Sequence, residues 1–313
     1  MDIAIRAEGL RKRYGGHEAV RGVDLSVPPG TVLGLLGPNG AGKTSIVRIL
    51  ATLQKPDAGH AVVAGFDTVT HPQQVRARIG LAGQYAAVDN QLTGRENLVL
   101  LGILLGLGRR GARGRADELL HRFELTGKAD RLVATYSGGL RRRLDLATCL
   151  IATPPVVFLD EPTTGLDPAS RQVLWELVRE QVSTGTTILL TTQYLEEADQ
   201  LADRIAMLAG GEVIAEGTAD MLKTKIGGAR LEFSLARFED VAAAVTALAG
   251  VATESPCTVD GRQMTVQLTS GFGVIAAAAT ALESAGLDVI DFGVRRPSLD
   301  EVFLALTGEG GAR

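Results

Sequence analysis

A glycine-rich segment at residues 37–44, GPNGAGKT, constrains the fold of this chain more than any other feature. It fits the phosphate-loop pattern G-x-x-x-x-G-K-[ST], and it lies between an apolar run at residues 31–37 and a helix-like stretch at residues 43–53. Glycines let successive backbone N–H groups converge on phosphate oxygens, and the N-terminus of the following helix adds a positive dipole end. The segment therefore predicts a strand, a phosphate-binding loop and a helix in direct succession.

The residues of this loop have separate predicted roles. The Lys43 ammonium is expected to reach the β- and γ-phosphates of a nucleotide, and the Thr44 hydroxyl is expected to hold Mg²⁺. The predicted phosphate cradle is completed by Gly37, Pro38, Asn39, Gly40, Ala41, Gly42 and Ser45.

A second strand-like segment, residues 155–161 (PVVFLDE), ends in two carboxylates. Because side chains alternate along a strand, Asp160 and Glu161 are expected to point in different directions and to serve different functions. Asp160 suits the Mg²⁺ shell, and Glu161 suits polarisation of an attacking water. Two acids at a strand end are often only a solvated turn, but the phosphate loop in the same chain favours the functional interpretation.

The rest of the first part of the chain predicts a parallel sheet with additions. Residues 3–36 show short apolar alternations broken by glycine and proline turns, which predicts an antiparallel β lead-in. Residues 80–136 predict a mostly helical insertion. Apolar segments at residues 156–160 and 186–192, separated by a helical pattern at residues 170–181, predict buried parallel strands.

The composition changes near residues 221–228 (MLKTKIGG), so domains are predicted at residues 1–222 and 223–313. Beyond this boundary the chain nearly repeats a strand followed by an Ala-rich helix, and a last strand-like segment at residues 289–294 closes the domain. This order predicts a small α+β domain of the ferredoxin-like kind.

Composition excludes several classes of protein. Lys and Arg number 32 against 36 Asp and Glu, a formal balance of −4 that argues against a general nucleic-acid binder. The two cysteines, Cys149 and Cys257, have no spacing typical of a disulfide scaffold or a zinc site. The longest apolar run, at residues 98–108, is shorter than the ~18 residues of a membrane span. With no secretory signal at the N-terminus, residence in the cytoplasm is expected.

A third motif is YSGGL at residues 136–140, which runs into RRRLDLATCL. Taken alone, it is equally typical of a Ser-Gly-Gly turn that caps a basic helix. Together with the phosphate loop, it resembles the signature of the ATP-binding cassette family, usually written LSGGQ. Ser137, Gly138 and Gly139 match that signature, whereas Tyr136 and Leu140 depart from it.

This resemblance implies that ATP and Mg²⁺ are the ligands and that two cassettes close head to tail as a homodimer on ATP binding. Each ATP is then held between one phosphate loop and the Ser137–Gly139 segment of the partner. Further positions match the family by their placement. Gln84 resembles the Q-loop glutamine that contacts Mg²⁺ and transmits to the membrane partner, Asp167 the D-loop aspartate that reaches across the dimer, and Tyr14 the aromatic that stacks on adenine.

One family position is changed. Where the family usually has a histidine that senses the γ-phosphate, this chain has Gln193, within Thr-Thr-Gln-Tyr at residues 191–194. An amide can donate a hydrogen bond to the γ-phosphate but cannot become cationic, so slower hydrolysis is expected. None of the four histidines is expected to lie near these motifs; they are His17, His60, His71 and His121.

Within the family, residues 83–98, 136–147 and 191–205 are similar to the daunorubicin and doxorubicin resistance ATP-binding subunits, and so is PSLDEVFL at residues 297–304. The resemblance implies the ATPase subunit of an ABC exporter, which powers efflux of a drug or antibiotic-like compound through a separate integral membrane permease. Its place would be the cytoplasmic face of the membrane, with no nucleic acid as partner. Alternatives are an importer ATPase, another ABC-2 type exporter of lipid or polysaccharide, and a soluble ABC ATPase without a transport role.

The stretch at residues 98–107 and the arginines that follow it allow three interpretations. A buried amphipathic helix followed by a solvated basic loop is favoured. A surface near the groove for a cytoplasmic permease helix and a contact with acidic lipid are the alternatives. The arginines concerned are Arg109, Arg110, Arg113 and Arg115.

Overall fold

The computed structural model describes residues 3–83, 88–227, 229–249, 251, 257–267 and 271–308. Contacts divide the chain into two compact units, Met1–Ala219 and Asp220–Arg313. The predicted boundary after residue 222 falls inside helix α8 (Ala219–Lys225), where the second unit begins. Among the described helices, none combines the length and the apolar character that a membrane span requires.

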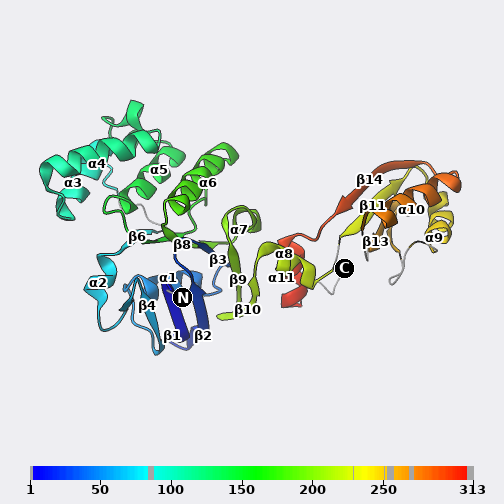
Figure 1. The fold of residues 1–313 in the computed structure, drawn as a ribbon, viewed down its shortest axis with the longest axis horizontal. Helices are drawn as coiled ribbons and strands as arrows, with labels where there is room; N and C mark the ends of the chain where they lie inside the picture. The colour runs from blue at the N-terminus through cyan, green and yellow to red at the C-terminus, as the bar shows by residue number, and fades with distance from the viewer. Residues whose placement is uncertain are drawn as a thin grey trace. The chain divides into compact units, whose positions relative to one another are not determined.

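The first unit is built on a six-stranded sheet with the order β10-β9-β3-β8-β7-β6 (Figure 1). Strands β9, β3, β8, β7 and β6 run parallel, and only β10 pairs antiparallel, with β9. The three central strands are buried along their whole lengths, as continuous apolar runs predict for a sheet covered on both faces. The strands span Val32–Leu36 (β3), Ile79–Ala82 (β6), Val156–Asp160 (β7), Thr187–Thr192 (β8), Arg204–Ala209 (β9) and Glu212–Gly217 (β10).

A second, antiparallel sheet has the order β2-β1-β4-β5, which confirms the predicted antiparallel lead-in. Its strands span Ile5–Tyr14 (β1), His17–Val27 (β2), Ala58–Val63 (β4) and Phe66–Asp67 (β5). Helix α1 (Lys43–Leu50) buries Ile46 and Ile49 in one apolar cluster with residues from both sheets. This packing holds the start of α1 at the carboxyl end of β3.

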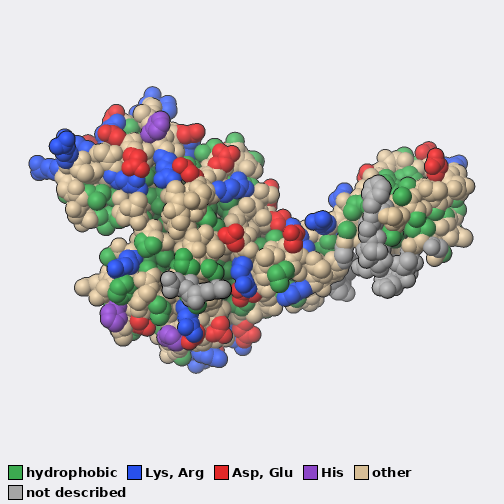
Figure 2. Space-filling view, viewed as in Figure 1, with side chains coloured by type: hydrophobic (Ala, Val, Ile, Leu, Met, Phe, Trp, Pro, Cys, Tyr) green, Lys and Arg blue, Asp and Glu red, His purple; other side chains and the backbone are tan. Residues whose placement is uncertain are grey.

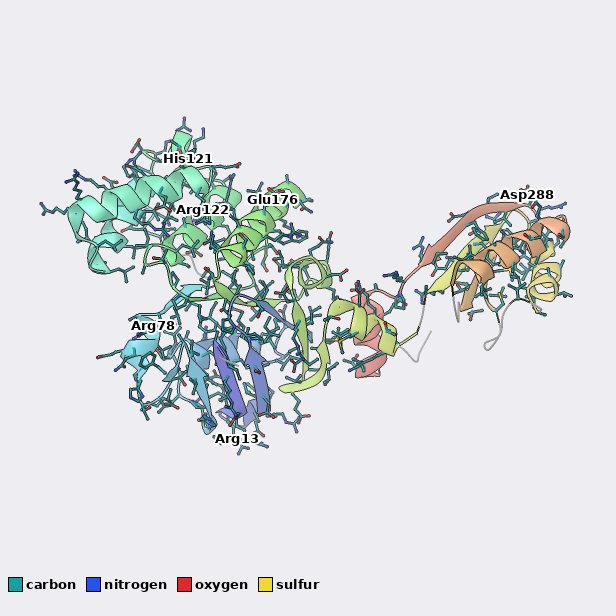
Figure 3. All side chains as sticks on the ribbon, in the orientation of Figure 1. Arg13, Arg78, His121, Arg122, Glu176 and Asp288 are labelled. Atoms are coloured by element: carbon teal, nitrogen blue, oxygen red, sulfur yellow. The ribbon has the colours of Figure 1, made fainter. Side chains whose placement is uncertain are left out.

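Helices form the remainder of the first unit (Figure 1). The longer helices share an apolar cluster that includes Phe123, Leu144 and Trp175, and Arg122 (Figure 3) pairs with Glu180 at 2.9 Å. The longer helices span Gly94–Leu104 (α3), Gly108–Arg122 (α4), Gly138–Cys149 (α5) and Pro168–Ser183 (α6). Shorter ones span Pro72–Arg76 (α2), Thr126–Lys128 (η1), Val133–Thr135 (η2) and Leu195–Leu201 (α7).

Two expectations about this region are wrong. The predicted helical insertion starts too early, because residues 79–82 form the parallel edge strand β6. The arginines after residue 107 do not lie in a solvated loop but in helix α4. Among them, Arg115 is largely buried and its Nη2 donates to the Leu150 carbonyl at 2.7 Å, so it joins α4 to the end of α5. On the face shown in Figure 2, acidic and basic side chains of the first unit are interspersed.

The second unit is a four-stranded antiparallel sheet with the order β12-β13-β11-β14. Its elements follow along the chain as β11 (Arg230–Leu235), α9 (Val241–Leu248), β12 (Thr258–Asp260), β13 (Gln263–Gln267), α10 (Gly271–Ser284) and β14 (Val289–Arg295), with η3 (Phe238–Asp240) before α9. This is the predicted ferredoxin-like succession of strands and helices. The prediction missed β12, because its three residues are all exposed and carry no apolar pattern.

The PSLDEVFL segment begins helix α11 (Leu299–Thr307). The Ser298 hydroxyl caps this helix by accepting from the Glu301 N–H at 3.2 Å, and the Glu301 carboxylate accepts from the Ser298 N–H. The same carboxylate lies 2.7 Å from Arg230 Nη2 on β11. Within the second unit, the motif therefore fixes the start of α11 and joins it to the sheet.

Candidate functional site

The glycine-rich loop connects β3 to α1, as predicted. Gly42 has a φ of 104°, a value that residues with a Cβ rarely adopt. A Cβ there would also clash with the Ala19 carbonyl. A Cβ at Gly37 would clash with the Leu208 carbonyl. The neighbouring strands thus leave room only for glycine, and the loop backbone is fitted closely against them.

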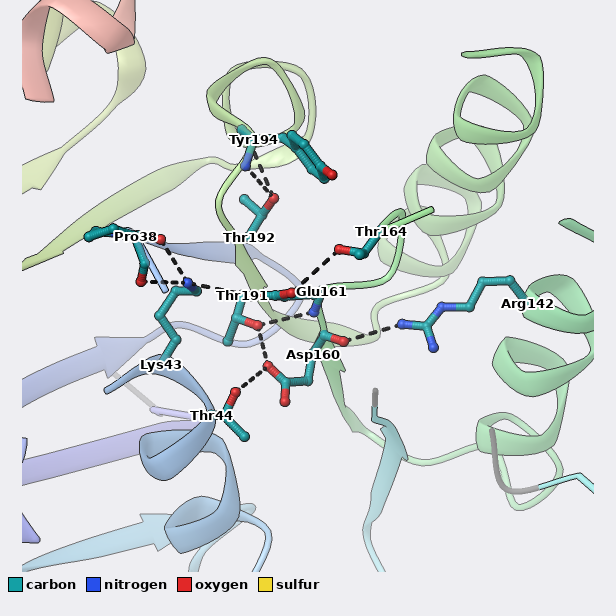
Figure 4. A network of polar contacts seen from close by, with 11 residues as sticks. Pro38, Lys43, Thr44, Arg142, Asp160, Glu161, Thr164, Thr191, Thr192 and Tyr194 are labelled. Carbon is teal, nitrogen blue, oxygen red and sulfur yellow. Dashed lines mark hydrogen bonds and ion pairs between the residues drawn. The ribbon is translucent and has the colours of Figure 1, made fainter. Parts of the chain in front are cut away.

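Lys43 is folded back into this loop (Figure 4). Its Nζ donates to the carbonyls of Gly37 and Pro38 at 2.7 and 3.1 Å and lies 3.5 Å from the Glu161 carboxylate. The side chain is only 4% exposed. Burial lowers the pKa of Lys43, and the attraction of Glu161 for the charged ammonium partly opposes this effect. The loop therefore holds a buried cation between its own backbone carbonyls and the Glu161 carboxylate.

Thr44 and Asp160 meet across the loop and the end of β7. Thr44 Oγ1 donates to Asp160 Oδ1 at 3.3 Å, and Thr191 Oγ1 donates to the same oxygen at 2.5 Å (Figure 4). Hard oxygen ligands of this kind are those that Mg²⁺ prefers, and one carboxylate with one hydroxyl leaves positions for phosphate and water. The donor set at Thr44 and Asp160 therefore fits Mg²⁺. Gln84, the third predicted ligand, lies outside the described residues.

Glu161 leaves the strand in a left-handed conformation. Its φ is 51°, which is uncommon for a residue other than glycine, and its N–H donates to the Thr191 carbonyl and hydroxyl at 3.0 and 3.1 Å. This turn places the carboxylate beside Lys43 and 3.4 Å from Thr164 Oγ1. Asp160 and Glu161 do lie in different surroundings. The cause is the left-handed turn of the backbone at Glu161, and not the predicted alternation of side chains along a strand.

These residues open onto a pocket of about 280 Å³. Residues of the β1–β2 hairpin, most of the predicted cradle and Glu161 line this pocket. The lining residues are Tyr14, His17, Ala19, Asn39, Gly40, Ala41, Gly42, Lys43, Thr44, Ser45 and Glu161. Gly37 and Pro38 are not among the described lining residues, and they contribute their carbonyls to Lys43 instead. The predicted loop residues thus divide between the pocket wall and the support of Lys43.

The pocket also contains one residue that sequence reasoning misplaced. His17 was expected to lie away from the motifs, but the hairpin pairs it with Tyr14, and both line the pocket. The Tyr14 hydroxyl donates to Gln54 Oε1 and lies 3.3 Å from Ser45 Oγ, while the residue stays 41% exposed. The aromatic ring therefore stands at the pocket wall with its hydroxyl tied to α1.

The signature segment begins α5. Ser137 caps this helix by accepting from the Leu140 N–H at 3.3 Å, and a Cβ on Gly139 would lie 2.6 Å from Ser170 Oγ on α6. Neither Ser137 nor Gly139 is among the described residues that line the pocket. Within one chain, the signature and the phosphate loop therefore belong to different surfaces.

The departure at the first signature position has a structural explanation. Tyr136 is 7% exposed, and its hydroxyl donates to the Lys128 carbonyl at 2.7 Å. Gly94, the first residue of α3, has no side chain, and a Cβ there would clash with this hydroxyl. Tyr136 is thus accommodated by a glycine on the neighbouring helix.

The close approach of Gly94 to the Tyr136 hydroxyl predicts how a substitution at Gly94 changes the free energy of unfolding. Gly94→Ala is expected to lower the free energy of unfolding by about 1–3 kcal/mol, because the tyrosine hydroxyl must move. Helix propensity alone would raise that free energy by about 1 kcal/mol, so a net loss reports the clash. Urea denaturation measures both effects. In a Tyr136→Phe background, Gly94→Ala is expected to be neutral or stabilising, and an equal loss in both backgrounds would contradict the explanation.

Asp167 lies at the start of α6, and Gln193 directly follows β8. Asp167 caps α6 by accepting from Ser170 N and Oγ at 3.0 and 2.7 Å, and these hydrogen bonds lower the pKa of its carboxyl. Gln193 is half-buried directly after β8, whose Thr191 pairs with Asp160. Their predicted contacts with a partner subunit and with the γ-phosphate stay predictions.

Sequence reasoning missed two residues of this site. Thr191 binds both Asp160 and the Glu161 N–H, yet its only sequence signal was its place at the end of a strand. Arg142 on α5 donates to the carbonyls of Asp160 and Pro162, and in the sequence it is one of three consecutive arginines. Neither residue belongs to a motif that predicts these contacts.

A phosphate loop on a parallel sheet, with carboxylates at the neighbouring strand end and a separate helical region, defines a nucleotide-binding cassette of the phosphate-loop class. Residues 20–164 match the model of the ABC transporter family. The chain is 53% identical to the daunorubicin resistance ATP-binding protein DrrA3 of Streptomyces coeruleorubidus, over 98% of this chain and 97% of that protein. It is 50% identical to the daunorubicin/doxorubicin resistance ATP-binding protein DrrA of Streptomyces peucetius, over 97% and 92%. This chain therefore belongs to the ABC transporter family, as an ATPase subunit of the group that contains these resistance proteins.

More distant relatives and solved structures agree with this assignment. The Nod factor export ATP-binding protein I of Ralstonia nicotianae is 38% identical over 97% of this chain and 94% of that protein. A solved ATP-binding subunit of an ABC transporter has a TM-score of 0.65 at 27% identity, covering 71% of this chain and 93% of that structure. A dimeric ATP-binding cassette with bound ADP and phosphate has a TM-score of 0.63 at 27% identity, over 68% and 98%.

Proposed function

We propose that this chain is the ATP-binding and ATP-hydrolysing subunit of an ABC exporter that drives efflux of a drug or antibiotic-like compound through a separate integral membrane permease. The observation that carries this proposal is the identity of about half of all residues with daunorubicin and doxorubicin resistance proteins across nearly the whole chain. That similarity includes the second unit, which lies beyond the solved cassettes' coverage of 71% and 68% of the chain.

In this proposal, ATP occupies the pocket in front of the phosphate loop. Tyr14 stacks on the adenine, the N–H groups of the loop bind the phosphates, and the buried Lys43 neutralises the β- and γ-phosphates. Thr44 and Asp160 hold Mg²⁺, with Gln84 as a further ligand. When bound, Mg²⁺ neutralises charge on the phosphate oxygens. Glu161, turned toward Lys43, accepts a proton from the attacking water, and Gln193 donates an amide hydrogen bond to the γ-phosphate.

The proposal includes a head-to-tail homodimer of cassettes on ATP binding. Its support is that Ser137 and Gly139 are not among the described residues that line the pocket, so the signature of one chain does not meet its own phosphate loop there. Ser137, Gly138 and Gly139 then contact the γ-phosphate across the interface, and Asp167 approaches the partner from the start of α6. The relatives of known structure include a dimeric cassette with ADP and phosphate.

Ser137→Arg tests this arrangement, because a long cation in the signature blocks closure on the partner's ATP. We expect ATP to bind the dilute monomer as before and turnover to fall to background. Mixing Ser137→Arg chains with Lys43→Ala chains is expected to restore turnover, since a mixed dimer has one intact loop facing one intact signature. Ser183→Arg, at the exposed end of α6, is the control. A mixture as inactive as its components would contradict the shared site.

Transport is tested with inverted membrane vesicles that contain the chain and its native membrane partner. ATP is expected to drive accumulation of daunorubicin in the vesicles, which is monitored by fluorescence quenching. Lys43→Ala chains are expected to support no accumulation. The 38% identity to Nod factor export ATP-binding proteins favours export of another kind of cargo, and a lipid or polysaccharide is the second candidate. ATP-driven movement of a lipid-linked oligosaccharide without daunorubicin would support that candidate. Accumulation that needs an added solute-binding protein would indicate import and contradict the proposal.

A further inference from the structure

Arg142 makes an unusual set of contacts between helix α5 and the catalytic end of the sheet (Figure 4). Its Nε donates to the Pro162 carbonyl at 2.7 Å, and its Nη2 donates to the Asp160 carbonyl at 3.3 Å. Its Nη1 donates to the Gly83 carbonyl at 2.7 Å and to Asp145 Oδ2 at 3.2 Å. One guanidinium therefore binds three separate backbone carbonyls and a carboxylate.

These contacts are protected from solvent. The Arg142 side chain is 14% exposed, and the Asp145 side chain is 1% exposed. Asp145 lies one helical turn after Arg142 and balances its charge, so the guanidinium is held without an uncompensated buried cation. Hydrogen bonds from a charged donor are shorter and stronger than those between neutral groups. The cluster is therefore rigid compared with an exposed arginine on a helix surface.

Two of these carbonyls belong to the residues on either side of Glu161 in the chain, at the end of β7. Arg142 binds the residue before it, Asp160, and the residue after it, Pro162. Glu161 itself has the left-handed φ of 51°, its N–H donates to Thr191, and its carbonyl accepts from the Thr164 N–H at 3.4 Å. A strained backbone conformation persists only where its surroundings hold it. The guanidinium adds to this restraint by binding the carbonyls of the residues before and after Glu161.

We propose that Arg142 is a positioning residue that holds Glu161 in its left-handed conformation and so aims its carboxylate at the attacking water. The inference rests on the proposed function, in which Glu161 accepts the proton. Arg142 also lies on the helix that Ser137 caps, so the signature and the base of one chain are joined through one side chain. A shift of α5 on closure against a partner's ATP is thereby transmitted to Glu161 of the same chain.

A planar guanidinium is required for this role. Its N–H groups point in fixed directions and reach both carbonyls at once, whereas a lysine ammonium is a single point of charge. Arg142→Lys keeps the positive charge beside Asp145 but cannot span both carbonyls. Arg142→Lys and Arg142→Gln are therefore both expected to misplace Glu161, which separates the loss of geometry from the loss of charge.

The test measures ATP turnover and amide hydrogen exchange on the full-length chain. Arg142→Lys and Arg142→Gln are expected to lower kcat by ~10- to 100-fold with KM for ATP unchanged, because a misplacement of about 1 Å costs that much. In a Glu161→Gln background, the same changes are expected to have no further effect on kcat. Exchange of the amides at residues 161–164 is expected to quicken in both Arg142 variants.

Arg143→Gln is the matched control, since it removes the same charge from the same helix. Arg143 instead binds the Phe123 carbonyl and the Glu124 carboxylate in the helical region, away from residues 160–162. Unchanged exchange at residues 161–164 in the Arg142 variants would overturn the inference, whatever the ATPase rate. An equal loss of kcat in the Arg143 control, or an additive loss with Glu161→Gln, would also overturn it. The wild-type rate in the same assay tests the proposed function separately.

Discussion

Replacing Glu161 with Gln is expected to leave ATP binding intact and to lower kcat by ~100- to 10,000-fold, the usual contribution of a general base. The amide has the same shape as the carboxylate and keeps a hydrogen-bonding oxygen for Thr164, but it cannot accept the proton of an attacking water. Because ATP then stays bound, the closed homodimer is expected to accumulate.

Single-turnover kinetics with labelled ATP measure the chemical step, and size-exclusion chromatography with ATP measures the dimer. Glu176→Gln on the exposed side of α6 is a matched control and is expected to behave as the wild type. Hydrolysis at the wild-type rate by the Glu161 variant would remove Glu161 from the role of base. Loss of ATP binding would instead indicate that the carboxylate is needed to hold the loop through Lys43.

Lys43→Ala is expected to weaken ATP binding by at least ~10-fold and to abolish turnover. The buried ammonium belongs to the one Lys or Arg side chain among the described residues that line the pocket, and hydrogen bonds to charged groups are worth about 1.5–3 kcal/mol each. The variant is expected to stay folded, because burial of Lys43 already penalises its charge and lowers its pKa.

Titration with a fluorescent ATP analogue measures the affinity, and circular dichroism establishes that the variant is folded. Lys225→Ala, an exposed lysine at the end of α8, is the control and is expected to change neither binding nor turnover. ATPase activity of the folded Lys43 variant at the wild-type rate would contradict the assignment of residues 37–44 as the phosphate-binding loop.

Local patterns were sufficient to predict the centre of the fold. The strand, loop and helix around Lys43 were predicted because each has a strong and separate signal, namely an apolar run, a glycine pattern and a helical period. The strand that ends at Asp160 was predicted for the same reason, with the same bounds as β7. Strand β6 was missed because its four residues, flanked by glycine and loop residues, are too short to show a period.

The geometry within the site depends on contacts between distant segments and could not be predicted from local patterns. The left-handed turn at Glu161 is held by Thr191, 30 positions away, and by Arg142 from helix α5. His17 joins the pocket only because a hairpin places it opposite Tyr14. Each of these contacts is set by how strands and helices pack. A single sequence, read without an alignment of its relatives, carries no direct record of that packing.

The central claim, that this chain powers a transporter through a separate permease, is tested most directly by capture of its complex. The tagged chain is crosslinked in native membranes with ATP, purified and analysed by mass spectrometry, with Lys43→Ala as the control. We expect an integral membrane protein with several apolar spans of ~20 residues and no phosphate loop of its own. We also expect the wild-type chain to retain more of it than the control. Recovery of only ribosomal or DNA-bound proteins would contradict the transport function while leaving the ATPase chemistry in place.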